Sequence, residues 1–80
     1  MNVTLHEEIA AILSDSGNRW MTAREIANSV NRRGRYRRKD GAPMETGQVW
    51  ARICEPQYRH MFERNETPDR SATRIRLSGP

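Results

Sequence analysis

The apolar positions near the start of the chain recur with the period of a helix. They fall at i, i+4, i+7 and i+8 on one face of a helix predicted over residues 4–16: Leu5, Ile9, Ile12 and Leu13. Thr4 and Glu7 form a capping box, in which each side chain accepts a hydrogen bond from the other residue's amide. Gly17 follows at the position where helices commonly end in a left-handed residue. The pattern therefore predicts an amphipathic helix with a defined start and end.

A second helix is predicted to begin at Ala23, after a short extended segment at 19–21. Thr22 and Glu25 repeat the capping box, and Met21 with Ile26 can form a hydrophobic staple across the helix start. Gly34 is expected to end this helix. Its buried stripe is formed by Ala23, Ile26, Ala27 and Val30.

A third helix is predicted over about 44–54. Its apolar face is short: Val49, Ile53 and Cys54, with Trp50 beside them. The start is left open, because Pro43 suits a first helical position while Thr46 can act as a cap. Pro56 is expected to end the helix.

Two strands are predicted near the C-terminus, at 59–64 and 73–78, with the polar linker 65–72 between them. In the second strand Thr73, Ile75 and Leu77 alternate with two arginines, which is typical of a strand with one buried face. The segment 19–21 is expected to add a third strand. The element order predicts a single α+β domain over residues 1–80, a small winged helix-turn-helix with three helices and a two- to three-stranded antiparallel wing.

Length and composition exclude several classes of protein. Eighty residues are enough for one domain with a modest core. Cys54 is the single cysteine, so no internal disulfide can form. No run approaches the ~18 apolar residues of a membrane span, and no signal-peptide pattern opens the chain. Because the apolar residues are periodic despite a mean hydropathy of −0.96, we expect a soluble cytoplasmic domain and no membrane partner.

Charge is concentrated in one segment. Six basic side chains lie between residues 32 and 39 with no acid among them: Arg32, Arg33, Arg35, Arg37, Arg38 and Lys39. The whole chain has 14 basic and 10 acidic residues, so outside this basic run eight basic side chains face ten acidic ones. A slightly acidic body with one positive segment predicts a polyanionic partner. Double-stranded DNA is the expected one.

Several segments resemble the HARE-HTH family of winged-helix domains, found in chromatin proteins, bacterial RNA polymerase subunits and restriction-associated enzymes. They are Trp20 to Ala27, Arg32 to Lys39, Gly41-Ala42-Pro43, Met61 to Arg64 and Ile75 to Leu77, with Gly34-Arg35-Tyr36-Arg37-Arg38 similar to the basic loop of that family. Ala42 departs from the pattern, because a capping hydroxyl usually precedes Pro43. The resemblance implies DNA binding linked to modified bases or restriction. We expect a transcription regulator or the targeting part of a restriction or defence system.

A helix-turn-helix places the N-terminal half of its third helix against the bases. Gln48 is then expected to read adenine, Arg52 to read guanine or grip a phosphate, and Thr46 to donate to a phosphate. The basic run is expected to follow the phosphate backbone, with Tyr36 turned toward the core.

The wing offers Arg64, Arg70 and Arg74 to the minor groove or to nearby phosphates. Three acids weaken that expectation: Glu63, Glu66 and Asp69.

The chemistry of an enzyme is not visible. His6 and His60 lack metal-ligand spacing, and no nucleophile with a base or glycine-rich phosphate loop is apparent. We therefore expect a non-catalytic protein with no metal, cofactor or small-molecule substrate. The alternative is a protein-protein interaction module, a phage or defence adaptor or inhibitor, that uses the wing acids and an exposed Trp50 as contacts. RNA binding is a weaker alternative, because the paired aromatic residues of common single-strand binders are missing.

Overall fold

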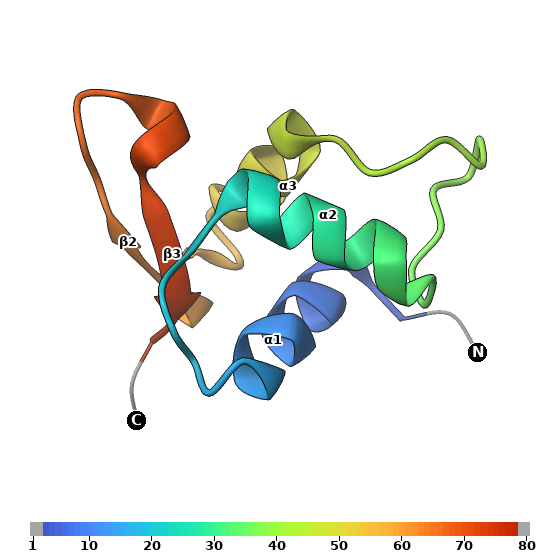
Figure 1. Cartoon of the computed structure of the whole chain (residues 1–80), viewed down its shortest axis with the longest axis horizontal. Helices are drawn as coiled ribbons and strands as arrows, with labels where there is room; N and C mark the ends of the chain where they lie inside the picture. The colour runs from blue at the N-terminus through green and yellow to red at the C-terminus, as the bar shows by residue number, and fades with distance from the viewer. Residues whose placement is uncertain (1–2, 79–80) are drawn as a thin grey trace.

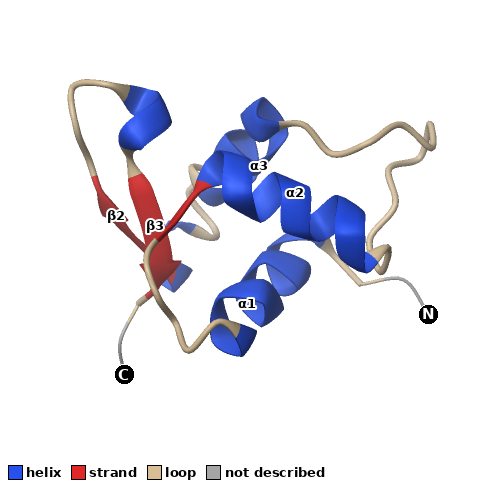
Figure 2. Cartoon of the chain, in the orientation of Figure 1, coloured by secondary structure: helices blue, strands red, loops and turns tan. Residues whose placement is uncertain are grey.

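The computed structural model describes residues 3–78, which form a small α+β fold (Figures 1 and 2). This part of the chain contains three α-helices and a three-stranded antiparallel sheet. In chain order the elements are α1 (Leu5–Asp15), β1 (Met21–Thr22), α2 (Ala23–Arg33), α3 (Thr46–Ile53), η1 (Arg59–Met61), β2 (Phe62–Asn65), η2 (Arg70–Ala72) and β3 (Arg74–Leu77), where η marks a short 3-10 helix.

Both predicted capping boxes are confirmed. The Thr4 hydroxyl accepts from the Glu7 N–H at 3.3 Å, and the Glu7 carboxylate accepts from the Thr4 N–H at 3.1 Å. Thr22 and Glu25 make the same pair of hydrogen bonds at 3.2 and 3.0 Å. At the other end of α2, Gly34 has φ +67° and donates its N–H to a carbonyl of the last turn, which ends the helix as expected.

Helix α3 starts at neither of the two predicted places, Pro43 as its first residue or Thr46 as its cap. Its cap is Glu45, and Thr46 is the first helical residue rather than the cap. Asn31 of α2 explains why the chain before Glu45 is not helical. Its side chain donates to the Met44 carbonyl at 3.0 Å and accepts from the Met44 N–H at 2.7 Å. These two hydrogen bonds fix the incoming chain against α2, so the helix starts only beyond them.

The sheet has the order β1-β3-β2, so the last strand lies in the middle. Met21 pairs with Ile75, and Phe62 pairs with Leu77, which confirms the expected third strand and its contact with the hairpin. The prediction of a strand from residue 59 is wrong, because residues 59–61 form η1 and β2 starts at Phe62. The predicted linker 65–72 also contains η2.

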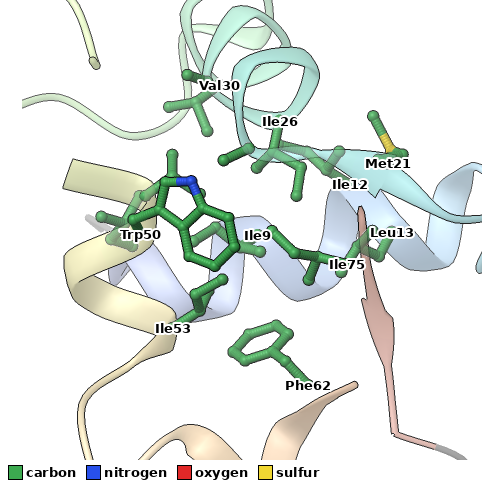
Figure 3. Packing of buried hydrophobic residues seen from close by; sticks show 14 of the residues in the cluster. Ile9, Ile12, Leu13, Met21, Ile26, Val30, Trp50, Ile53, Phe62 and Ile75 are labelled. Atoms are coloured by element: carbon green, nitrogen blue, oxygen red, sulfur yellow. The ribbon is translucent and has the colours of Figure 1, made fainter. Parts of the chain in front are cut away.

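One apolar cluster joins the helices to the sheet (Figure 3). Its most deeply buried members come from all three helices and from β3: Ile9, Leu13, Ile26, Val30, Val49, Ile53 and Ile75. Trp50 is only 9% exposed, so the prediction of an exposed Trp50 is wrong. Cys54 was expected on the core side but is exposed, and its sulfur contacts Arg64 at 3.3 Å. Cys54 is the C-terminal cap of α3 and lies just beyond the last helical residue, Ile53.

Candidate nucleic-acid interface

Three element ends meet around an open hollow of about 520 Å³: the starts of α2 and α3, and η2 at the tip of the β2–β3 hairpin. The residues that line it are Thr22, Ala23, Arg24, Thr46, Trp50 and Ser71. Figure 1 shows the loop 34–45 on one side of the start of α3 and the hairpin tip on the other side. The loop, the start of α3 and the hairpin tip therefore follow one edge of the molecule, which we call the α3 edge.

Arg24 belongs to the α3 edge although its position in the sequence did not suggest a site. It is exposed, lies in the first turn of α2 and lines the hollow together with Thr46. The positive end of a helix dipole disfavours a cation there. An arginine at the second helical position, two residues after the cap Thr22, is therefore the signal in the sequence that points to this residue.

The loop between α2 and α3 presents its basic side chains in an alternating pattern. Arg35, Arg37 and Lys39 are exposed, while Tyr36 and Arg38 are half-buried. Tyr36 packs against the apolar core, as expected. In residues 3–78 no carboxylate forms an ion pair with the three exposed cations. The loop thus carries a row of uncompensated positive charge.

Arg38 holds the loop in shape. Its guanidinium donates to the Asp40 carboxylate at 2.9 Å and to the Pro43 carbonyl at 3.3 Å. Gly41, with φ +74°, turns the chain between these two partners. Arg38 is therefore engaged within the loop rather than presented like its neighbours.

The first two residues of the basic run do not join the row. Arg33 lies 2.9 Å from Glu8 and 2.7 Å from Asp15, both on α1. The hydrogen bond to Asp15, together with the charge of Glu8, raises the pKa of Arg33 despite the opposing cost of burial. Arg32 donates to Ser29 at 3.2 Å and lies beside Arg19 in a different hollow. The first two residues of the basic run thus lie in α2 and the remaining four lie in the loop.

Two of the three residues predicted for α3 are engaged within the protein. The Gln48 side-chain oxygen accepts from the Glu45 N–H at 3.2 Å, which caps the helix. Arg52 lies 3.7 Å from Glu55 and 5.6 Å from the centre of the Tyr58 ring. Thr46 is exposed at the start of the helix.

The hairpin contributes less positive charge to the α3 edge than its arginines suggest. Arg64 lies 3.4 Å from Glu66 and also contacts Cys54. Asp69 accepts from the Ser71 N–H and hydroxyl, which lowers the pKa of its carboxyl. Arg74 is exposed. The side chain of Arg70, the third predicted wing contact, lies outside the described residues.

Other kinds of site find no support in the part of the chain that the structure describes. Residues 3–78 contain no group of three or more His, Cys, Asp or Glu side chains able to hold a metal ion. None of the described helices has the length and apolar character to cross a bilayer. No protein-family model, curated protein or solved structure matches this chain, so its resemblance to HARE-HTH domains stays a prediction.

Proposed function

We propose that this chain is a non-catalytic DNA-binding module of the winged-helix class. Its element order and the strand order β1-β3-β2 support the class, with α2 and α3 as the helix-turn-helix pair and the β2–β3 hairpin as the wing. A transcription regulator or the targeting domain of a restriction or defence system is the corresponding role.

The observation that carries the proposal is the composition of the α3 edge. The start of α3 lies between a hairpin tip and a loop whose Arg35, Arg37 and Lys39 have no acidic partner in residues 3–78. Arg24 adds a cation in the hollow between them. A duplex presents two rows of phosphates on either side of a groove, and cations beside a protruding helix end match that arrangement.

In the proposed complex, the start of α3 enters the major groove. Thr46 donates its hydroxyl to a phosphate, and the exposed cations of the loop lie along the adjacent backbone. The wing reaches the neighbouring groove or phosphates, where Arg74 is its exposed cation.

An NMR titration with duplex DNA tests the proposal. Amide signals of the loop, of Arg24 and of the start of α3 should shift, while those of η1 should stay in place. If four to six phosphates are neutralised, log K should fall with log salt with a slope of about −3 to −6. An affinity independent of salt, or shifts confined to η1, would contradict the proposal.

A further inference from the structure

The outward side of α3 offers little that can read a base. Val49, Trp50 and Ile53 are buried, so helical geometry directs positions 47, 48, 51 and 52 away from the core. Gly47 and Ala51 are exposed and have no polar side-chain atom. Half of the positions on this side therefore cannot form a hydrogen bond to a base edge.

The two long side chains on the same side are held by the protein itself. Gln48 needs both its amide oxygen and its amide nitrogen to read adenine, but the oxygen caps Glu45. Arg52, near the C-terminal end of the helix, stacks over the ring of Tyr58 and forms an ion pair with Glu55. A base contact by Gln48 would give up the hydrogen bond that caps α3, and one by Arg52 would give up its contacts with Tyr58 and Glu55.

Glu45 is the exposed long side chain at the start of α3. A carboxylate can accept from the amino group of cytosine. Its negative charge, however, also opposes the approach of the phosphates that flank the groove. Glu45 is thus the residue to test for any remaining base preference.

The loop between α2 and α3, in contrast, carries exposed cations that suit phosphates. Exposed and half-buried side chains alternate from Arg35 to Lys39, as in an extended chain, where alternate residues lie about 7 Å apart. Asn31 anchors the end of the loop through Met44, and Arg38 ties its middle to Pro43. A loop backbone that is fixed before binding loses little conformational freedom on contact.

We infer that the protein holds duplex DNA through its phosphates and not through its base edges, so that duplex DNA of any sequence is its ligand. This inference rests on the proposed function and narrows it. Gln48 then supports α3 and does not set a sequence preference, which revises the expectation from the sequence.

The decisive experiment is a selection from a pool of random-sequence duplexes with the full chain, followed by affinity measurements on single duplexes. No enriched motif is expected. The dissociation constants of AT-rich, GC-rich and mixed duplexes of equal length should agree within about threefold, whereas sequence-specific proteins separate specific from random DNA by about 10³ or more.

Two variants sharpen the result, each checked for folding by circular dichroism. Combining Arg35→Glu with Arg37→Glu should weaken binding to every duplex by the same factor, about tenfold or more, and make the salt slope shallower by about 2. Gln48→Ala, the matched control on α3, should leave the dissociation constants of the three duplexes within about threefold of one another.

The outcomes separate the inference from the proposed function. An enriched motif, or an order of affinities that changes with Gln48→Ala or Glu45→Ala, would overturn the inference and leave DNA binding intact. Failure of the unmodified chain to bind any duplex at low salt would overturn both.

Discussion

Arg33 Nε lies 2.9 Å from Oε2 of Glu8, a carboxylate whose side chain is 1% exposed. The pair joins the last turn of α2 to the buried side of α1, and Asp15 shares the same guanidinium. Arg33 therefore acts as a bridge between helices, although the sequence places it in the basic run.

Arg33→Ala should destabilise the protein strongly, because it leaves the carboxylate of Glu8 buried without a partner. Losses for such broken pairs reach 3–5 kcal/mol, and we expect about 3 kcal/mol here because the arginine itself is partly exposed. Urea unfolding followed by circular dichroism measures the change.

Arg32→Ala is the matched control, since it removes the same charge from the same helix turn without touching Glu8. It should change the free energy of unfolding by about 1 kcal/mol or less, because it removes only the hydrogen bond to Ser29. Replacing the pair together, as Glu8→Leu with Arg33→Met, should recover most of the loss. Equal effects of the Arg32 and Arg33 variants would argue against the bridge.

Arg24→Glu should weaken DNA binding about tenfold at low salt, because it places a negative charge between the starts of α2 and α3. Arg59→Glu makes the same change of charge in η1, which follows the C-terminal end of α3. It should have a much smaller effect. Fluorescence anisotropy with one duplex compares the two variants, and comparable losses would show that only net charge matters.

Asn31→Ala should loosen the loop by removing both hydrogen bonds to Met44. We expect a loss of about 1–2 kcal/mol in the free energy of unfolding, together with faster amide exchange between residues 35 and 44. Asn28→Ala, one turn earlier on an exposed site of α2, is the control and should leave exchange in the loop unchanged. Unaltered loop exchange in the Asn31 variant would contradict its anchoring role.

Acid should destabilise the fold through its helix caps. The backbone hydrogen bond from Thr22 is the largest cause that lowers the pKa of Glu25, and hydrogen bonds from Thr4 lower the pKa of Glu7. A lowered pKa means that the folded state favours the carboxylate. The stabilisation is therefore complete above the ordinary glutamate pKa of about 4.3 and is lost as pH falls through the lowered value.

The melting temperature measured from pH 7 to pH 3 tests this acid effect. Glu25→Gln should melt lower than the unmodified chain at pH 7, since an amide caps more weakly than a carboxylate. It should also lose less on acidification. A pH profile parallel to that of the unmodified chain would show that this cap does not contribute.

The sequence predicted correctly those features that depend on residues close together in the chain. The capping boxes at Thr4 and Thr22 and the end of α2 at Gly34 involve residues within four positions of one another, and all three predictions are confirmed. The start of α3 was missed because it depends on Asn31, which is thirteen residues from Met44.

In the candidate site, too, contacts between residues far apart in the chain could not be predicted from the sequence. A count of charges cannot reveal that Arg33 meets Glu8, which lies twenty-five residues away in the chain. It also cannot show that Gln48 caps its own helix or that Arg24 shares a hollow with Thr46. The cluster of positive charge was visible in the sequence, but its division between a structural bridge and an exposed row depends on tertiary packing.

The outer side of α3 has room for larger side chains at two positions. A Cβ added at Gly47 would meet no atom within 4 Å, and Ala51 is already exposed, so both positions can accept larger side chains without disturbing the core. Replacing Gly47 would also strengthen the helix by about 1 kcal/mol. If the proposed binding to duplex DNA of any sequence holds, these two positions are where one or two substitutions could install recognition of a chosen sequence.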